Sequence, residues 1–180
     1  MTTLIGIEYD DSCVLVADSR TTDSVGYIYS HANVKKISER NGYLIAGSGE
    51  VLPCDVAQHI WEPPVPGKAD KKDLFHFMVS KAMPSLRRCL SSNGFNFDEP
   101  KTEQRFQFLI AVCGEIFDID DELAVSKNTS GVYAAGSGAP FAIGAMHAGA
   151  DAYEAMEIAA TLTAFTAGPY ISKSQFKHSK

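Results

Sequence analysis

Short apolar runs broken by turn residues occupy the first part of the chain, and they predict strands rather than helices. Residues 3–9 and 13–17 are rich in side chains that suit a pleated sheet, and Asp10-Asp11-Ser12 between them favours a turn. The chain therefore starts with a predicted hairpin. Further strands are predicted at residues 25–29, 34–37 and 43–46, with the hairpin signal Asn41-Gly42 before the last of them.

The pattern then changes to one of helices. Residues 50–61 can form a helix that has Pro53 near its start, and the proline-rich segment 62–67 predicts a loop. Residues 70–90 place apolar side chains mostly on one side of a long helix, which Pro84 is expected to kink.

Strands return in the second half of the chain and are followed by two alanine-rich helices and a short tail. The predicted strands are residues 105–113, 115–119, 123–126 and 131–135, and the predicted helices are 140–149 and 152–167. Alternating blocks of strands and helices favour antiparallel sheets with helices stacked outside, an α+β layered domain. No internal repeat or linker divides residues 1–180, so we expect a single domain.

Composition and charge exclude several classes of protein. A net charge of −6 and the absence of a basic stripe argue against a nucleic-acid binder. No apolar run approaches the roughly 20 residues of a membrane-spanning helix, and the N-terminus does not resemble a signal peptide. The four cysteines are scattered, which favours reduced thiols in a cytoplasmic protein. The five histidines share no ligand spacing and the acidic residues 118–122 lack an EF-hand pattern, so neither a metal nor a cofactor is predicted.

One group of residues near the N-terminus has the composition of a catalytic site. Met1 precedes a small residue, the situation in which methionine is normally removed, and Thr2 would then carry a free α-amine. Because that amine has a pKa of roughly 7.7–8.0, it can act as the base that a threonine hydroxyl needs. A lysine nearby would favour the neutral amine by repulsion, and a carboxylate would hold the lysine. Asp18, at the end of the second predicted strand, and Lys35 or Lys36 can supply these groups.

Five segments taken together resemble the proteasome β subunits and the bacterial HslV protease. They are Thr2-Thr3-Leu4-Ile5-Gly6-Ile7, Val16-Ala17-Asp18-Ser19-Arg20-Thr21, Asn33-Val34-Lys35-Lys36-Ile37, Leu44-Ile45-Ala46-Gly47 and Tyr133-Ala134-Ala135-Gly136-Ser137-Gly138-Ala139-Pro140-Phe141. Asp18-Ser19-Arg20-Thr21 is also similar to Anbu, another bacterial proteasome relative. The resemblance runs in order through nearly the whole chain. It implies a four-layer αββα sandwich, the N-terminal nucleophile hydrolase fold.

The resemblance also implies a role for each matching residue. Thr2 is the expected nucleophile, Asp18 orients the catalytic lysine, and that lysine is Lys36, with Lys35 as the second choice. The backbone N–H of Gly47 is the expected oxyanion donor, and Ser137 is expected to hydrogen-bond near the threonine amine. The residues expected to line a cleft that takes an extended peptide are Thr21, Thr22, Ile45, Ser48 and Gly49.

The sequence departs from the family pattern in two places. Two extra residues lie between Asp18 and the lysine pair relative to HslV. The segment 163–168 lacks an aspartate and a serine that support the site in proteasome subunits, and Thr166 is a possible substitute for one hydroxyl.

The leading hypothesis is a threonine-type endopeptidase that cleaves unfolded polypeptides inside a homo-oligomeric ring, with a possible ATP-dependent unfoldase as partner. The first alternative is a catalytically degenerate structural or regulatory subunit of such a ring, in which Met1 stays in place. The others are an N-terminal nucleophile amidase with a closed pocket for a small amide, and an α+β binding domain in which Thr2 has no role.

Overall fold

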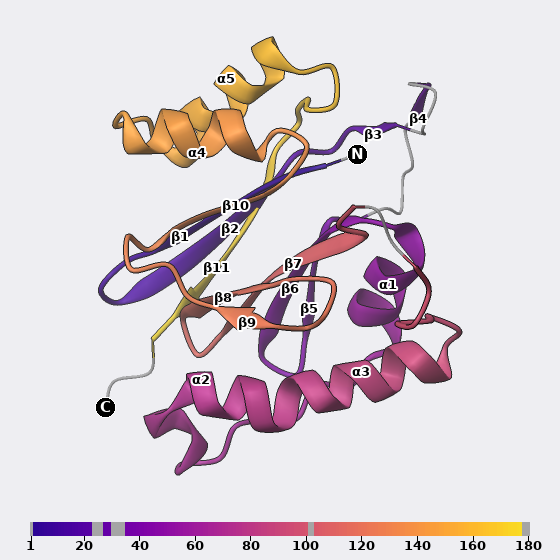
Figure 1. Cartoon of the computed structure of the whole chain (residues 1–180). Coiled ribbons are helices and arrows are strands. Elements are labelled where there is room, and N and C mark those ends of the chain that lie inside the picture. The colour runs from indigo at the N-terminus through magenta and orange to yellow at the C-terminus, as the bar shows by residue number, and fades with distance from the viewer. Residues whose placement is uncertain (1, 23–26, 30–34, 101–102, 178–180) are drawn as a thin grey trace.

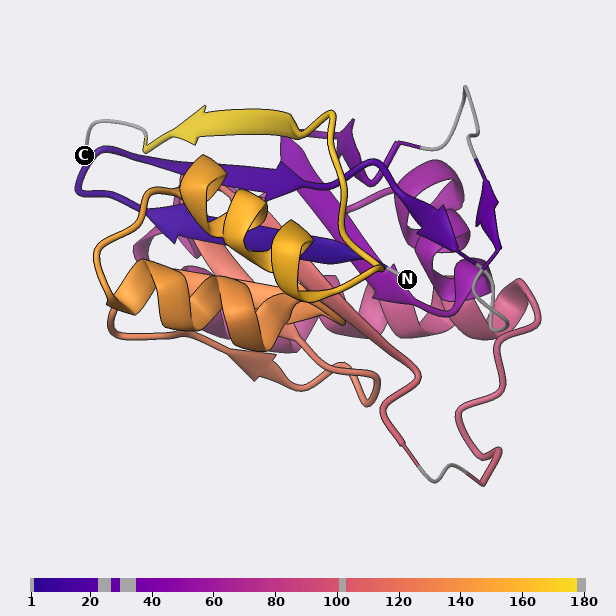
Figure 2. The same cartoon turned by 90° about the horizontal axis from the view of Figure 1, so that it is seen from above.

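Four layers make up the protein in the computed structural model, with two sheets packed face to face and helices on both outer sides (Figure 1). The structure describes residues 2–22, 27–29, 35–100 and 103–177. The described parts of the chain lie together in both views (Figure 1 and Figure 2). The layered αββα sandwich expected from the sequence is therefore confirmed.

The first sheet has the strand order β10-β1-β2-β11, and all its neighbours are antiparallel. Strands β1 (Thr3–Glu8) and β2 (Ser12–Ala17) form the predicted N-terminal hairpin, with Leu4 opposite Ala17. The other strands are β10 (Val132–Gly136) and β11 (Ile171–Phe176). Strand β1 is therefore central, and its first residue lies at one end of the sandwich.

The second sheet has the order β5-β6-β7-β8-β9, also antiparallel. Strands β5 (Ile37–Arg40) and β6 (Tyr43–Gly49) are joined by the predicted Asn41-Gly42 turn, in which both residues have positive φ, 46° and 78°. This is the geometry of a tight hairpin turn that suits the twist of the strands. The remaining strands are β7 (Phe106–Val112), β8 (Glu115–Ile119) and β9 (Val125–Ser126), and a separate ribbon pairs β3 (Thr21–Thr22) with β4 (Ile28–Tyr29).

Helices cover the outer face of each sheet. Helices α4 (Ala139–His147) and α5 (Ala152–Leu162) cover the first sheet. The second sheet is covered by α1 (Val51–Asp55), the π-helical turn η1 (Val56–Ile60), α2 (Leu74–Phe77), the π-helical turn η3 (Met78–Ala82) and α3 (Met83–Ser92). The short 3-10 turn η2 (Asp70–Lys72) lies between η1 and α2.

Three apolar clusters fill the spaces between the layers. Because side chains alternate across a strand, Leu4 and Leu15 face the second sheet, whereas Ile5 and Val16 face α4 and α5. Phe77, Leu86 and Phe108 belong to the third cluster, between the second sheet and the helices below it. Both faces of the first hairpin are therefore buried.

Several element boundaries differ from the predictions. The predicted helix 70–90 starts only at Leu74, where Asp73 accepts a hydrogen bond from the His76 N–H, and Pro84 is accommodated at the first turn of α3 after the π-helical turn η3. A strand was expected at 34–37, but β5 starts at Ile37, and residue 34 lies outside the described residues, as do 25 and 26 of the strand expected at 25–29.

The C-terminal region shows the largest difference. The predicted helix 152–167 ends at Leu162, and the expected tail contains strand β11. Residues 164–167 bond to the end of β2 instead: the Ala167 carbonyl accepts from Ser19 N–H at 3.1 Å, and the Ala164 carbonyl accepts from Arg20 Nη1 at 2.6 Å. Contacts with β2 and with the residues that follow it therefore override the local preference of this region for helix. No helix in the described part of the chain has the length and apolar character needed to cross a membrane.

Candidate active site

A cleft of about 650 Å³ opens beside the N-terminal end of β1. It is bordered by the start of β1, by β3, by the end of β6, by the start of β7 and by the turn after β10. The lining residues are Thr2, Thr22, Ser48, Gly49, Glu50, Glu103, Gln104, Arg105, Phe106, Gln107, Gly136 and Ser137.

Thr2 is held at this cleft by the turn that follows β10. Its carbonyl accepts a hydrogen bond from the Ser137 N–H at 2.9 Å and a longer one from Ser137 Oγ at 3.4 Å. Gly136 has φ +85°, and a Cβ at that position would lie 2.0 Å from the Thr2 carbonyl oxygen. Glycine is therefore required for the two segments to approach. Ser137 was expected near the threonine amine, and in the structure it contacts the carbonyl of Thr2.

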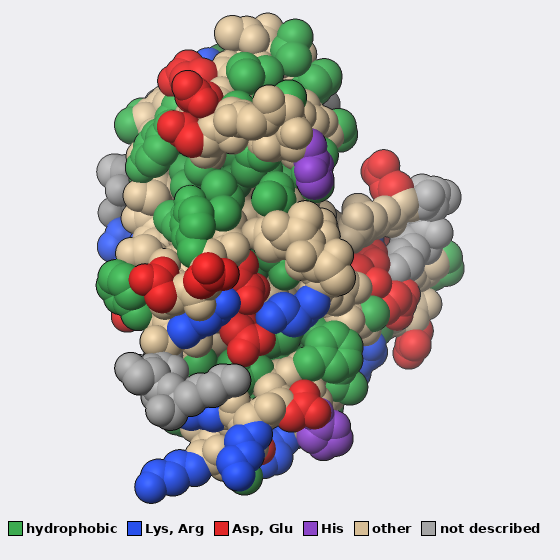
Figure 3. All heavy atoms as spheres, turned by 90° about the vertical axis from the view of Figure 1, so that its left-hand side faces the viewer, with side chains coloured by type: hydrophobic (Ala, Val, Ile, Leu, Met, Phe, Trp, Pro, Cys, Tyr) green, Lys and Arg blue, Asp and Glu red, His purple; other side chains and the backbone are tan. Residues whose placement is uncertain are grey.

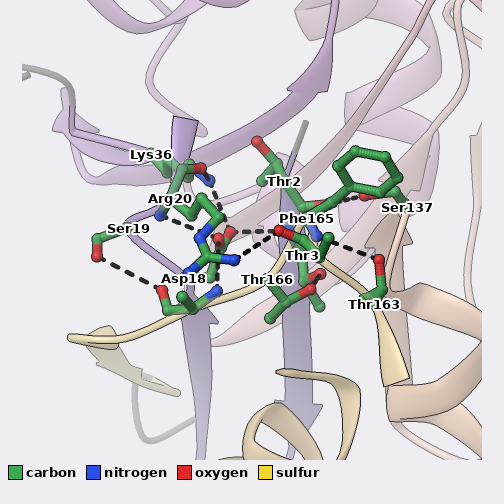
Figure 4. A network of polar contacts seen from close by, with 12 residues as sticks. Thr2, Thr3, Asp18, Ser19, Arg20, Lys36, Ser137, Thr163, Phe165 and Thr166 are labelled. Atoms are coloured by element: carbon green, nitrogen blue, oxygen red, sulfur yellow. Dashed lines mark hydrogen bonds and ion pairs between the residues drawn. The ribbon is translucent and has the colours of Figure 1, made fainter. Parts of the chain in front are cut away.

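Asp18 is the centre of the polar network at this end of the sheet (Figure 4). It follows the last residue of β2 and is fully buried. Its carboxylate accepts backbone N–H bonds from Thr3 at 2.8 Å, Arg20 at 3.1 Å and Ala167 at 3.4 Å. Several donors therefore satisfy the hydrogen-bonding capacity of this buried carboxylate.

Lys36 is the lysine that reaches this carboxylate. Its Nζ lies 2.6 Å from Asp18 Oδ1 and 2.5 Å from the Arg20 carbonyl oxygen, and the side chain is only 7% exposed. Gln58 Nε2 donates to the Lys36 carbonyl at 3.0 Å, which fixes the backbone at this point. Lys35 is exposed. The structure therefore places Lys36, and not Lys35, next to Asp18.

Burial lowers the pKa of Lys36 below its ordinary value, although the charge and hydrogen bond of Asp18 act in the opposite direction. At Lys36, desolvation of the buried ammonium outweighs its attraction to the Asp18 carboxylate. Lys36 thus combines a close carboxylate with a reduced affinity for its proton.

The end of β6 provides backbone N–H groups at the cleft. Ser48 and Gly49 line the cleft, as the sequence predicts, whereas Gly47 is not among its lining residues. A Cβ at Gly47 would meet Cys54 Sγ at 2.8 Å and the Phe108 ring at 3.0 Å, so the α-carbon faces the helices.

The other residues expected to bind substrate separate into two groups. Thr22 lines the cleft with Thr2, and Thr21 is paired with Tyr29 in the β3–β4 ribbon. Ile45 is fully buried in the cluster between the second sheet and the helices. The structure therefore brings Thr2, Thr22, Ser48, Gly49 and Ser137 together at the cleft and leaves Ile45 in the core.

Two hydroxyls behind the site complete its rear wall. Thr3 Oγ1 and Thr166 Oγ1 lie 2.5 Å apart, and both residues are buried. Thr166 was considered from the sequence as a substitute hydroxyl, whereas Thr3 was not singled out. A polar side chain at the first position of a buried central strand was the available signal, because a buried hydroxyl needs a partner.

Glu50 and Arg105, also at the cleft, were not anticipated. Arg105 donates to Glu50 Oε1 from Nε at 2.6 Å and to Oε2 from Nη2 at 2.9 Å. The sequence holds little signal for this pair because the two residues are far apart in the chain. Among the described residues, no three His, Cys, Asp or Glu side chains are grouped in a way that could hold a metal ion.

Solved structures with this arrangement of sheets and helices cover the whole chain. A protein of Thiobacillus denitrificans named BPH superposes with a TM-score of 0.73 and 22% identity, over 99% of this chain and 100% of its own. Its complex with epoxomicin gives a TM-score of 0.71 and 22% identity, over 98% of this chain and 100% of its own. HslV of Trypanosoma brucei gives a TM-score of 0.64 and 19% identity, over 97% of this chain and 99% of its own. No protein-family model and no curated protein matches the sequence.

These matches show the class of fold. The chain has the N-terminal nucleophile hydrolase fold, and within that class it has the form found in HslV, as the sequence resemblance implied. The similarity extends over nearly the full length of each chain, so the fold is shared as a whole and not through one motif.

Proposed function

We propose that the protein is a threonine-type endopeptidase in which Thr2 is the nucleophile after Met1 has been removed. The observation that carries the proposal is the buried Asp18 carboxylate, which joins Lys36 to the N–H of Thr3, the residue next to Thr2. A buried lysine–aspartate pair is costly to maintain for stability alone. The position of the pair beside a threonine at a cleft supports a catalytic role for it.

In this mechanism the Thr2 hydroxyl attacks the carbonyl carbon of a substrate peptide bond, and the freed α-amine of Thr2 accepts the hydroxyl proton. The C–N bond of the substrate breaks, the amine returns the proton to the leaving nitrogen, and an ester between Thr2 and the acyl group remains. Water then hydrolyses this ester with the same amine as the base, which regenerates the hydroxyl.

The surrounding groups have separate roles. The Lys36 ammonium disfavours a second positive charge on the Thr2 amine, and Asp18 holds the lysine in position. An amide at the end of β6 stabilises the negative oxygen of the tetrahedral intermediate. Gly47, the donor that the sequence resemblance implies, lies in this part of β6. Ser137 holds the Thr2 main chain.

The shape of the cleft supports a polypeptide substrate. It is bordered by strand ends, so an extended chain can lie along exposed backbone groups of β3 and β6. Assembly into a homo-oligomeric ring that encloses the site, supply of unfolded chains by an ATP-dependent unfoldase and a cytoplasmic location belong to the same proposal.

The test measures the N-terminal mass of the purified protein and its cleavage of unfolded polypeptides. We expect a chain that starts at Thr2, and a Thr2→Ala variant without detectable cleavage. Alanine is also small, so Met1 removal is preserved in this variant. Thr161→Ala, on α5 and away from the cleft lining, is the matched control and should retain full activity. Lys36→Ala should lose roughly 100-fold or more, the scale of general acid–base catalysis.

The complex of BPH with epoxomicin supplies an independent probe. We expect epoxomicin to inhibit cleavage by the wild type in proportion to its occupancy of the cleft. A mature chain that retains Met1, or activity that survives Thr2→Ala, would contradict the mechanism. The first of these outcomes would favour the catalytically degenerate subunit.

A further inference from the structure

A buried glutamine joins strands β5 and β6 at the point where their pairing ends. Gln58 belongs to the π-helical turn η1 and is only 5% exposed. Its Nε2 donates to the Lys36 carbonyl at 3.0 Å and to the Ile45 carbonyl at the longer distance of 3.4 Å. Because both partners are acceptors, the atom between them is the NH2 group of the glutamine and not its carbonyl oxygen. Burying an amide is costly without such partners, so the contacts define the place of this side chain.

The pairing of β5 with β6 shows where the N–H of Gly47 points. The two-residue turn after β5 is closed by Arg40 and Tyr43, which form a hydrogen-bonded pair of the antiparallel ladder. Such pairs recur at every second position, so the N–H of Gly47, four positions after Tyr43, points to the β5 side. The last pair of this ladder is Ile37 with Ala46, and Gly47 lies one position beyond it in the regular part of β6.

A continued ladder would bring this N–H to the carbonyl of Lys36. Lys36 precedes the first residue of β5 and is therefore the residue opposite Gly47, but the two are not paired as strand residues. The Lys36 carbonyl accepts from Gln58 instead. The side-chain amide thus occupies the acceptor that would close the next hydrogen-bonded pair. The N–H of Gly47 is left next to the lysine that binds Asp18.

Gly47 is also fixed from the side of the helices. A Cβ there would meet Cys54 Sγ at 2.8 Å and the ring of Phe108, its partner on β7, at 3.0 Å. Cys54 lies on α1, which continues directly into the turn that carries Gln58. One helical segment therefore packs behind the α-carbon of Gly47 and also holds the carbonyl opposite its N–H.

We infer that Gln58 is a positioning residue for catalysis: by holding the carbonyl of Lys36, it keeps the N–H of Gly47 available to the oxygen that becomes negative during peptide cleavage. The inference rests on the proposed peptidase function. A donor stabilises the transition state best when it is free and aligned before the reaction starts, because breaking an existing hydrogen bond adds to the barrier. Gln58 is buried and does not line the cleft, so it acts through its neighbours and not on the substrate.

Two other roles of Gln58 lead to different results. If the glutamine only stabilised the fold, its loss would lower the melting temperature and leave kcat unchanged. If it positioned the Lys36 ammonium, its loss would change the pKa of the Thr2 amine and shift the pH dependence of kcat/KM. Loss of a free donor at Gly47 lowers kcat at every pH and leaves KM and the shape of the pH profile nearly constant, because the oxyanion forms only in the transition state.

The test compares Gln58→Met with Gln175→Met. Methionine is an unbranched side chain without an N–H to donate. Gln175 is the matched control, because its Nε2 donates to the Gly42 carbonyl and its Oε1 accepts from the Gly114 N–H, both at 2.8 Å, but it lies on β11 and does not line the cleft. For each variant we would measure kcat and KM across pH, the melting temperature, and the amide hydrogen exchange of Gly47.

We expect kcat to fall about 10- to 100-fold in Gln58→Met, less than the roughly 100- to 1,000-fold effect of removing an oxyanion donor, with KM changed less than about twofold. Exchange at Gly47 should become slower in this variant, because its N–H can then bond to the Lys36 carbonyl. A purely structural role predicts faster exchange. Gln175→Met should keep wild-type kcat and wild-type exchange at Gly47. Should Gln58→Met fail to fold, Gln58→Ala, which removes the donor without adding bulk, decides the question.

The two proposals fail in distinguishable ways. If cleavage depends on Thr2 but Gln58→Met keeps kcat, shifts the pH profile or leaves the exchange at Gly47 unchanged, the positioning role is wrong and the peptidase function stands. If the wild type cleaves nothing, the proposed function fails, and the catalytic role of Gln58 fails with it. Slower exchange at Gly47 in Gln58→Met would then show only that the glutamine sets the end of the β5–β6 pairing.

Discussion

Near each end of strand β1 a lysine pairs with acidic side chains. The two clusters differ in burial and in the number of carboxylates. At the cleft end, Lys36 is 7% exposed and Asp18 is fully buried. At the other end, Lys127 is 31% exposed and pairs with Glu115 at 2.7 Å and with Glu8 at 3.5 Å. Figure 3 shows acidic and basic side chains intermixed on the face where β1 ends, below the apolar side chains of the α4–α5 layer.

Burial and the number of carboxylates explain the difference in proton affinity. Burial lowers the pKa of Lys36 more than its single carboxylate raises it. Burial also lowers the pKa of Lys127, but the hydrogen bond to Glu115 and the charges of Glu115 and Glu8 outweigh this effect, so its pKa is raised. The second cluster therefore ties segments together, whereas the first holds a charge in an unfavourable environment, a property common at functional sites.

The largest expected effect is that of removing the carboxylate at the cleft end. Asp18→Ala leaves the Lys36 ammonium and the N–H groups of Thr3 and Arg20 without their acceptor. The cost should be roughly 3–5 kcal/mol in the free energy of unfolding, the scale of an uncompensated buried charge. Urea denaturation measures it. Glu8→Ala is the matched change at the other end and should cost clearly less, because water can solvate Lys127 and Lys177. Equal costs would contradict the contrast drawn here.

The second effect is a difference in pH dependence between the two lysines. Because the pKa of folded Lys36 lies below its unfolded value of about 10.5, the unfolded state binds more protons between these two values. The stability of the wild type relative to Lys36→Met should therefore rise with pH in that window, by at most about 1.4 kcal/mol per pH unit.

Lys127 should show the opposite sign. Its folded pKa is raised, so its contribution is fully present below about 10.5 and is lost only as the pH rises through the folded value. Denaturation of wild type, Lys36→Met and Lys127→Met across the alkaline range measures both slopes. Slopes of the same sign would show that the two environments are alike.

The smallest expected effect is that of Lys127→Met at neutral pH. A partly exposed ion pair contributes roughly 0–1 kcal/mol, and salt should reduce this further. Denaturation at low and high ionic strength measures the change. A loss well above 1 kcal/mol would mean that this cluster, too, is effectively buried.

The elements that could be predicted from the sequence are those whose pattern is local. The hairpin of β1 and β2, the Asn41-Gly42 turn and the α4–α5 pair follow from apolar periodicity and turn residues. Strand β11 was missed because Ile171 to Phe176 forms a strand only by pairing with β2, which lies more than 150 positions earlier. Helix α5 was predicted too long because residues 164–167 contact the end of β2 in place of continuing the helix.

The candidate site shows the same division. The N-terminal hairpin was enough to predict that Asp18 returns to the start of the chain. The choice of Lys36 over Lys35 came from the family resemblance and not from the strand pattern. Ile45 and Ser48 were both expected to line the cleft. Side chains alternate along a strand, so an odd-numbered and an even-numbered residue of β6 point to opposite faces. Strand alternation could have separated them. The Glu50–Arg105 ion pair could not have been found in this way, since Glu50 follows β6, Arg105 precedes β7 and the two residues are 55 positions apart.

The contacts of residues 164–167 with Asp18, Arg20 and Thr3 have a consequence for the order of biosynthesis. The strands that carry Thr2 and Asp18 leave the ribosome first, and the segment that closes the network behind them leaves among the last. A nascent chain therefore contains Thr2 and Asp18 before the segment that completes their hydrogen-bond network has been made. Under the proposed peptidase function, the complete site would form only when synthesis of the chain is almost finished.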